Sequence, residues 1–419
     1  MIMSQTPRRR TAVSCSLLLV ALAPGLAACG AGGHPLAREP GEPAGRITLA
    51  GLGGDTRLAD PADDLKVTAQ GQARITDVTA VDGHGRYVRG RLSADGHTWR
   101  STVPLAARSR YTVDVSTEND DGAPGRKRLT YRTSAAKAKK PMQVELGPGK
   151  GTYGVGQPLT VKLSRAVRTQ SERAVVERGL KVASTPRVEG AWYWVGDKEL
   201  HYRPREYWPV GARVRLESRL EGVKVREGVY AGAAKPVELK IGDRIEAVTD
   251  AAAHEMTVYR NGEEINTMPV TTGKPGFETR NGKKVVLEKQ PLVRMTGASI
   301  GVGGTAEDYD LQVSYATRVT WSGEYVHAAP WSVGSQGAAN VSHGCTGMST
   351  DDAAWFFETV RQGDIVEVVN SYGEDMAPFG NGFGDWNLSW TKWQEGSALT
   401  PGAGNGGSPA DANRLRPGI

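Results

Sequence analysis

The sequence predicts a mainly β protein with two β-sandwiches followed by a third β-rich unit that contains one main helix. Short segments with alternating apolar and polar residues recur along the chain, and turn dipeptides separate them at the spacing typical of sandwiches. Gly and Pro contribute 53 and 23 of the 419 residues, which indicates many turns without a collagen-like repeat. At about 100–200 residues per domain, this length predicts several domains with cores of their own.

The first sandwich is expected over residues 46–134. Its predicted strands share the alternating pattern and include Leu65–Ala69, Tyr87–Leu92 and Tyr111–Val115. Asp-Gly dipeptides beginning at residues 82, 95 and 121 favour turns between such strands. A linker rich in Ala and Lys then follows up to Pro141.

The second sandwich is expected over residues 141–242, where the same pattern returns. Two interpretations apply to Trp192, Trp194 and Trp208: a platform that stacks sugars, or core packing. Aromatic residues that alternate along strands are more often core or cross-strand partners, so we favour core packing.

The third unit, residues 243–370, begins with a hairpin. Asn261-Gly262 separates two strand-like runs, and this dipeptide is a strong signal for a tight hairpin turn. The single convincing helix is Thr350–Gln362, because apolar residues follow helical spacing after Ser349 and Thr350. A strand is predicted over 364–369.

The last residues divide into a C-terminal subdomain, 371–400, and a tail, 401–419, that is predicted to be disordered. Trp386, Trp390 and Trp393 are spaced as one face of a helix. We expect this face to pack onto the third unit.

Residues 1–28 have the order of a secretory signal: Arg8–Arg10, then an apolar run, then small residues before Cys29. Leu-Ala-Ala-Cys resembles a bacterial lipobox, in which Cys29 accepts the lipid; the alternative is a cysteine of no consequence. Lipidation would anchor the exported chain to the outer face of the cytoplasmic membrane. Residues 29–45, rich in Gly, Pro and Ala, would form a flexible tether.

The formal net charge is +6, and Lys and Arg are scattered along strand-like segments. No nucleic-acid partner is expected from this pattern. A mildly basic protein is still attracted to polyanionic surfaces such as a bacterial wall or lipid head groups.

Cys345 is the only cysteine in the body of the chain, and it lies just before the predicted helix. A helix N-terminus and a nearby imidazole both lower a thiol pKa, and the thiolate is the nucleophile. His327 is the candidate base, and the N–H groups of Gly344 and Cys345 are candidates for an oxyanion hole. The alternative is a buried structural cysteine. No cofactor or metal is expected, because no carboxylate or second cysteine pair accompanies His327, His343 and Cys345 at zinc-like spacing.

Tyr325–Gly334 and Asn340–Cys345, which ends in Ser-His-Gly-Cys, resemble the signature of L,D-transpeptidases. The similarity continues through Gly363–Asn370 and Gly384–Asn387. It is greatest to the actinobacterial branch, in which two immunoglobulin-like domains precede the catalytic domain. The resemblance therefore covers nearly the whole mature chain.

This resemblance implies that the protein cross-links peptidoglycan stem peptides. Cys345 would attack the carbonyl of the third residue of a donor stem and expel D-Ala, with His327 as base and then acid. Transfer to the side-chain amine of an acceptor stem would give a 3→3 bridge. Carbapenems are expected inhibitors, because their ring opening resembles the donor half-reaction.

The resemblance also assigns roles around these two residues. Tyr309 would lie on a lid over the pocket, and Met295 would lie on the lid's first strand. His343 and Gly344 would shape the site beside the nucleophile, and Trp331 would wall the cleft. The expected contacts with the donor stem come from Ser322, Gly323, Asn340 and Ser342.

One position departs from the family pattern. Gly347 stands where the family usually has Arg or Asn, so a side chain that would hydrogen-bond near the nucleophile is missing. Two alternatives to the transpeptidase therefore stay open: an L,D-carboxypeptidase that trims stems, and a non-catalytic wall-binding lipoprotein with a decayed site.

Overall fold

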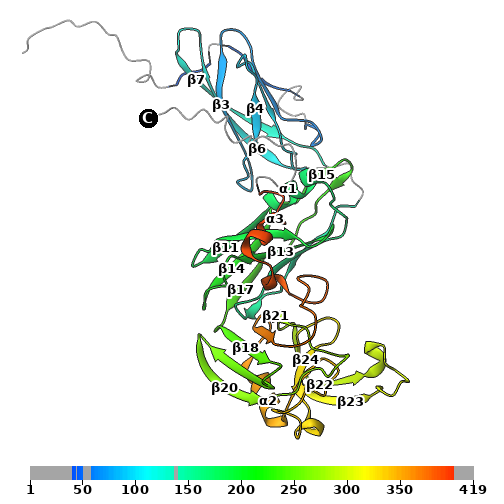
Figure 1. Cartoon of the computed structure of the whole chain (residues 1–419). Coiled ribbons are helices and arrows are strands. Elements are labelled where there is room, and N and C mark those ends of the chain that lie inside the picture. The colour runs from blue at the N-terminus through cyan, green and yellow to red at the C-terminus, as the bar shows by residue number, and fades with distance from the viewer. Residues whose placement is uncertain (1–39, 44, 51–57, 136–139, 401–419) are drawn as a thin grey trace, which may run out of the picture.

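The computed structural model describes residues 40–43, 45–50, 58–135 and 140–400. The predicted signal peptide, Cys29 and the tail 401–419 lie outside the described residues. Three bodies follow one another along the molecule, with the N-terminal one at the top of Figure 1 and the third at the bottom. Strands dominate all three, which confirms the predicted mainly β class.

The first body is a sandwich of two antiparallel sheets, ordered β1-β2-β5-β4 and β3-β6-β7. Trp99, Tyr111 and Tyr131 are buried between the sheets. Its strands are β1 (Ile47–Leu49), β2 (Lys66–Ala69), β3 (Arg74–Asp82), β4 (Gly90–Leu92), β5 (Thr98–Ser101), β6 (Arg110–Glu118) and β7 (Pro124–Arg132).

The second body packs the sheet β12-β13-β10-β8 against the sheet β11-β14-β17-β9. Trp192, Trp194 and Trp208 are all buried in its core, as the core interpretation predicted. Its strands are β8 (Val144–Gly147), β9 (Gly151–Tyr153), β10 (Leu159–Leu163), β11 (Leu180–Thr185), β12 (Gly190–Trp194), β13 (Glu199–Pro204), β14 (Arg213–Ser218), β15 (Lys224–Arg226), β16 (Val229–Tyr230) and β17 (Val237–Ile241).

The second body also holds a helix that the sequence analysis missed, α1 (Gln170–Arg178). Thr169 caps its N-terminus by accepting a hydrogen bond from the Glu172 N–H. The expectation of one helix was wrong here because four of the nine residues of α1 are charged, which left too few apolar side chains to show a helical period.

The third body contains a five-stranded sheet, β20-β19-β18-β26-β21, and a four-stranded sheet, β22-β23-β24-β25, with α2 packed between them. The predicted hairpin is present, and Asn261 and Gly262 both have positive φ, as a tight hairpin turn requires. The elements are β18 (Ile245–Asp250), β19 (Glu255–Arg260), β20 (Glu263–Pro269), β21 (Gly282–Val285), β22 (Glu288–Thr296), η2 (Gly297–Ile300), β23 (Asp310–Arg318), β24 (Tyr325–Ala328), η3 (Pro330–Ser332), β25 (Thr346–Met348), α2 (Thr350–Thr359) and β26 (Ile365–Val369).

The C-terminal segment, with η4 (Asp385–Asn387) and α3 (Trp390–Glu395), returns along the second body. Trp393 Nε1 donates to the Ala191 carbonyl at 2.9 Å, and the Arg203 guanidinium lies 4.7 Å from the rings of both Trp386 and Trp393. The expectation that the tryptophan face packs onto the third body was therefore wrong. Spacing reveals an apolar face but not its partner, and here Arg203 supplies a cation–π surface.

Backbone hydrogen bonds join the second and third bodies. Gly154 and Gly156 donate backbone hydrogen bonds to the carbonyls of Gln362 and Gly363, both at 2.9 Å. A Cβ on Gly154 would lie 2.1 Å from Asp364 Oδ1, so the backbone approach requires glycine.

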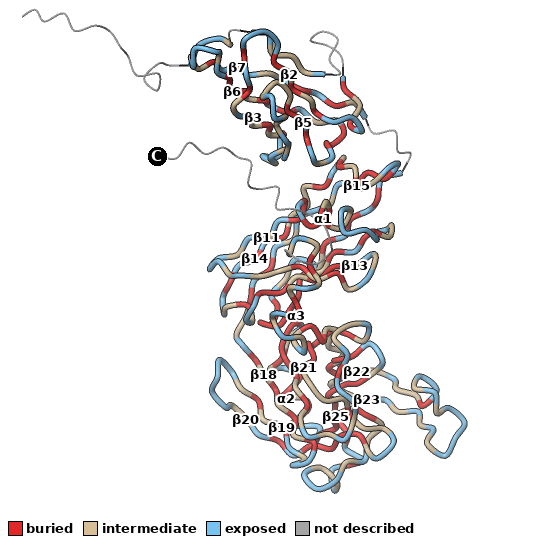
Figure 2. Tube along the Cα trace, turned by 45° about the horizontal axis from the view of Figure 1, so that its top comes forward, coloured by how far each residue is buried: buried red, intermediate tan, exposed pale blue. Residues whose placement is uncertain are grey.

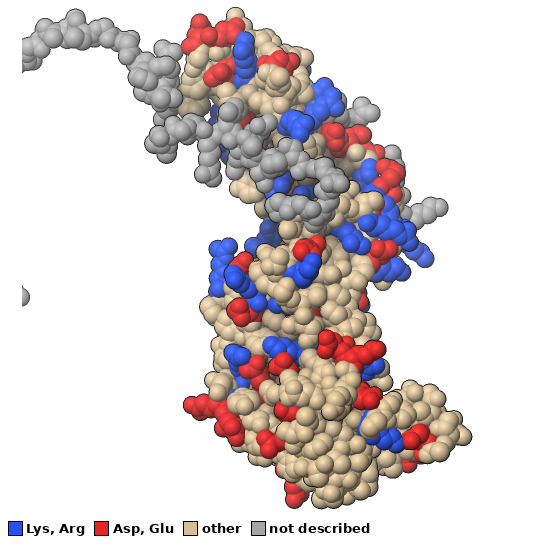
Figure 3. All heavy atoms as spheres, in the orientation of Figure 1, with Lys and Arg blue, Asp and Glu red and all other residues tan. Residues whose placement is uncertain are grey.

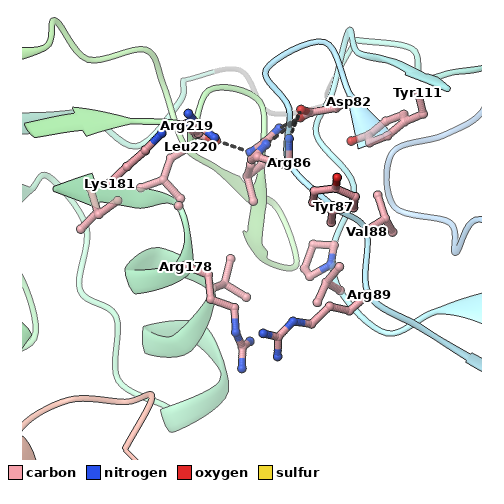
Figure 4. Close-up of a pocket in the computed structure, with 16 residues that line it drawn as sticks. Asp82, Arg86, Tyr87, Val88, Arg89, Tyr111, Arg178, Lys181, Arg219 and Leu220 are labelled. Carbon is pink, nitrogen blue, oxygen red and sulfur yellow. Dashed lines mark hydrogen bonds and ion pairs between the residues drawn. The ribbon is translucent and has the colours of Figure 1, made fainter. Parts of the chain in front are cut away.

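Figure 4 shows the junction between the two sandwiches. Arg86 donates a hydrogen bond to the Arg219 carbonyl and forms an ion pair with Asp82. A cavity of about 410 Å³ opens beside this contact. Arg89 and Arg178 lie on its two sides with their guanidinium groups toward each other.

Buried residues form a separate core in each body, and the hairpin β22–β23 projects from the third body as a largely exposed arm (Figure 2). Lys and Arg are prominent over the two sandwiches in Figure 3. They outnumber Asp and Glu by 18 to 11 over residues 141–242, whereas over residues 243–370 there are 10 against 17. Within the described residues, no helix combines the length and apolar composition needed to cross a membrane.

Candidate active site

Two parallel strands, β24 and β25, bring His327 and Cys345 to the same face of their sheet. His327 pairs with Gly347 and Val326 pairs with Thr346, so Cys345, directly before β25, lies opposite Tyr325. Side chains two residues apart on a strand share a face. The thiol and the imidazole are therefore diagonal neighbours, and the structure brings the predicted nucleophile and base together.

Hydrogen bonds fix the turn that presents the nucleophile. Ser342 Oγ donates to the Cys345 carbonyl at 2.6 Å and accepts the Gly344 N–H at 3.1 Å. Gly344 has φ +112, which favours glycine, and its carbonyl accepts from Thr279 Oγ1 at 2.9 Å. The Gly344 N–H is bonded to Ser342 in this structure, and its place in an oxyanion hole stays a prediction. Ser342, predicted to contact substrate, braces this turn.

The thiol of Cys345 is protonated in the resting site. Burial raises its pKa to about 12, although the Tyr325 backbone N–H acts in the opposite direction. Sγ also lies 3.5 Å from the Gly323 carbonyl oxygen, which accepts a hydrogen bond from the thiol. The predicted help from a helix N-terminus is absent, because β25 separates Cys345 from the start of α2.

His327 is held as a neutral base. Its Nδ1 donates to the Ala328 carbonyl at 2.8 Å, which leaves the lone pair on Nε2. Burial lowers the pKa of the imidazole below its usual value, so it is uncharged at neutral pH. Trp331 packs over it with ring centroids 6.1 Å apart and stays 54% exposed, as a cleft wall would.

The lid arises from β22 and β23, and Ser299 and Ile300 between these strands line the cavity beside the nucleophile. Tyr309 is half-buried and stacks on His343 with centroids 5.0 Å apart, and Met295 pairs with Leu311 on the lid strands. Glu307, also on the lid, accepts a 2.8 Å hydrogen bond from His343 Nε2 and forms an ion pair with Lys274. We call Lys274, Glu307 and His343 the lid latch.

Ser322, Gly323, His343 and Gly344 line one cavity of about 640 Å³ beside the nucleophile. Asn340 does not line it. Its side chain accepts from the Thr272 N–H at 2.9 Å and donates to the Ala251 carbonyl at 2.8 Å. Asn340 therefore supports the loop under the site in this structure, and its predicted contact with the stem stays a prediction.

A buried ionic cluster next to the nucleophile was missed from the sequence. Lys284 Nζ lies 2.9 Å from Glu324 Oε2, and Arg280 Nη1 lies 3.0 Å from Glu324 Oε1. Lys284 and Glu324 are both buried. The available signal was a charged residue at the start of each of two apolar runs, Lys284 before Val285–Leu287 and Glu324 before β24.

Gly347 fits its site closely. A Cβ there would lie 3.0 Å from the Ala329 Cβ and 3.1 Å from the Thr271 Cγ2. Gly347 and Thr271 exchange two backbone hydrogen bonds, of 2.8 and 2.9 Å. The space where the family places a larger side chain is filled by neighbours, so the departure keeps the loop packed.

Comparison with known proteins identifies the class. Residues 56–224 match the family model described as bacterial Ig domain, and residues 244–368 match that of the L,D-transpeptidase catalytic domain. L,D-transpeptidase 2 of Mycobacterium tuberculosis (strain CDC 1551 / Oshkosh) is 34% identical over 93% of this chain and 96% of its own. L,D-transpeptidase 5 of M. tuberculosis (strain ATCC 25618 / H37Rv) is 30% identical over 96% of this chain and 89% of its own. A solved structure of the LD transpeptidase LdtMt1 in complex with imipenem is 37% identical, with TM-score 0.47, over 55% of this chain and 100% of that one.

The chain belongs to the L,D-transpeptidase family. It is a peptidoglycan L,D-transpeptidase, an acyltransferase, with bacterial immunoglobulin-like domains ahead of its catalytic domain.

Proposed function

We propose that Cys345 and His327 carry out both half-reactions of 3→3 cross-linking. His327 Nε2 takes the thiol proton as Sγ attacks the carbonyl of the third stem residue. A thioester forms, the amide bond to D-Ala breaks, and the imidazolium gives its proton to the leaving amine. The side-chain amine of an acceptor stem then attacks the thioester and restores the thiol.

The observation that carries this proposal is a neutral imidazole beside a protonated thiol. A thiol whose pKa is about 12 is a weak nucleophile until a base removes its proton. The hydrogen bond from Nδ1 to the Ala328 carbonyl fixes the tautomer that can act as this base. Deprotonation is therefore expected to accompany attack, so the thiolate does not accumulate beforehand.

The test is intact-mass spectrometry of the purified protein with a tetrapeptide stem, alone and with an acceptor stem. We expect an adduct on the wild type, release of D-Ala and a cross-linked dimer, and none of these with Cys345→Ala. Tripeptide and D-Ala without dimer would instead indicate a carboxypeptidase. No adduct on folded wild-type protein would contradict acyl transfer at Cys345.

We further propose that carbapenems acylate Cys345, since a strained ring carbonyl is a ready acceptor for the thiol once His327 deprotonates it. The complex of LdtMt1 with imipenem is a relative's property that agrees with this proposal. A carbapenem adduct on the wild type and none on Cys345→Ala is the expected result.

Export and lipid anchoring at Cys29 complete the proposal. The basic, apolar and small-residue order of residues 1–28 supports it. We expect the wild type in the membrane fraction of cells and Cys29→Ser in the soluble fraction. Equal partitioning of the two would contradict the anchor.

A further inference from the structure

The ionic cluster beside the nucleophile carries one more positive than negative charge. Glu324 is shared between Lys284, at 2.9 Å, and Arg280, at 3.0 Å. Lys284 is almost fully buried and also donates to the Arg280 carbonyl at 2.7 Å, so it faces away from solvent. The Arg280 side chain is 39% exposed and lines the cavity beside the nucleophile, the one that Gly344 and Gly323 also line. Arg280 is therefore the basic member of the cluster that faces the cavity.

Several contacts fix the position of this guanidinium relative to the reacting atoms. Arg280 Nη1 lies 3.4 Å from Ser322 Oγ, and the next residue, Gly323, has its carbonyl 3.5 Å from Cys345 Sγ. The Arg280 backbone N–H also donates to Glu324 at 3.2 Å. Ser322 and Gly323 are adjacent, so the guanidinium and Sγ both lie against the same short segment.

The rest of the cavity wall restricts where an anion can bind. Arg280 is the one Lys or Arg among the described residues that line it, whereas three lining residues are acidic: Glu278, Glu324 and the exposed Glu374. Glu278 is bonded to the Gly276 N–H at 3.0 Å. Within this lining Arg280 carries the fixed positive charge, so a carboxylate is attracted to it and repelled by the glutamates.

We infer that Arg280, held by Glu324 and Ser322, binds the free C-terminal carboxylate of the donor stem. A guanidinium forms charge-assisted hydrogen bonds with a carboxylate and reads its planar geometry. Binding this group places the scissile carbonyl one residue back, over Cys345 Sγ. The cluster thus selects donors that end one residue after the bond that is broken, and this inference rests on the proposed acyl transfer.

The experiment compares two donor tetrapeptides that differ only at the C-terminus, a free acid and its amide. We measure the acylation rate of the wild type, Arg280→Ala, Arg280→Lys and, as a matched control, Arg260→Ala, an exposed arginine of the hairpin β19–β20. The wild type and Arg260→Ala should prefer the acid by about 10- to 100-fold. Arg280→Ala should lose this preference through a higher KM for the acid, and Arg280→Lys should keep part of it.

A neutral probe separates this role from a purely structural one. Alkylation of Cys345 by iodoacetamide and thermal melting should be similar in the wild type and Arg280→Ala. If Arg280→Ala lowered the acylation rate equally with both donors, Arg280 would only hold the loop, and the inference would be overturned. Wild-type acylation without any preference for the acid would also overturn it while leaving the transpeptidase proposal intact. No acylation by either donor would refute the proposed function itself.

Discussion

Different interactions hold the lid and the floor of the active site. We use floor for β24, β25 and the turn Ser342–Cys345. On the floor, β24 and β25 place His327 and Cys345 by backbone pairing, and Ser342 and Thr279 bond the turn from below. On the lid, Glu307 ties the hairpin to Lys274 and His343 through partly exposed side chains. Buried backbone pairing is insensitive to salt, whereas exposed ion pairs contribute little and are screened. The floor should therefore determine chemistry, and the lid should determine access.

The largest expected effect concerns the floor. His327→Ala should slow acylation of Cys345 by about 10²- to 10⁴-fold, because the imidazole that takes the thiol proton is then missing. In the wild type, the acylation rate should rise with pH through the lowered pKa of His327, and this limb should vanish in the variant. Stopped-flow acylation by a carbapenem across pH 4–8 checks both points. An unchanged pH profile in His327→Ala would remove His327 from the role of base.

The second prediction concerns the packing around Gly347 in β25, where the family usually has Arg or Asn. Gly347→Asn should lower the free energy of unfolding by about 1–3 kcal/mol, since its Cβ would press on Ala329 and Thr271. Gly334→Asn is the control, because a Cβ there has no neighbour within 4 Å. Chemical denaturation of both variants measures the difference. A stable and faster Gly347→Asn enzyme would show that glycine is a defect at this position.

The C-terminal segment, like the floor, is held by buried contacts. One of them is the pair His201–Asp385, so the stability of this segment should depend on pH. Burial acts to lower the pKa of His201, but Asp385 at 2.7 Å, together with Glu199, raises it to about 9. A raised pKa means that the contribution to stability is present below about 6.5 and is lost as the pH rises through 9. We expect the melting temperature to fall over this window in the wild type.

The control for that titration is His201→Gln, which keeps a hydrogen-bonding side chain but cannot be charged. Its melting temperature should be lower near pH 6 and should change less between pH 6.5 and 9. Parallel curves for the two proteins would mean that His201 does not hold the segment.

The smallest expected effect concerns the lid. Glu307→Gln should change the acylation rate by only about two- to fivefold, because it weakens an exposed latch. Added salt should bring the wild type toward the variant. Asp310→Asn is the matched control, since it breaks the exposed pair with Arg294 on the same hairpin without touching His343. A hundredfold loss in Glu307→Gln would place Glu307 in the chemistry.

The sequence points to Cys345 and His327 as a pair, because Ser-His-Gly-Cys is local and His327 follows a strand-like run, and the register of β24 and β25 places both on one face. It also predicts the strands whose alternation is regular, such as those around Asn261-Gly262. It does not predict contacts between distant residues of opposite charge: Lys284 and Glu324 are 40 positions apart, and only the order of β21 and β24 in space joins them. The sequence also does not reveal that Trp393 packs against Arg203, because these two residues are far apart along the chain.

The return of the C-terminal segment has a mechanical consequence. The chain leaves the second sandwich at about residue 242, forms the catalytic domain, and then clasps the same sandwich again through Trp386 and Trp393. The chain passes twice between the second sandwich and the catalytic domain, and two connections resist rotation of one domain against the other better than one does. We therefore expect the catalytic domain and the second sandwich to move as one rigid unit relative to the first sandwich.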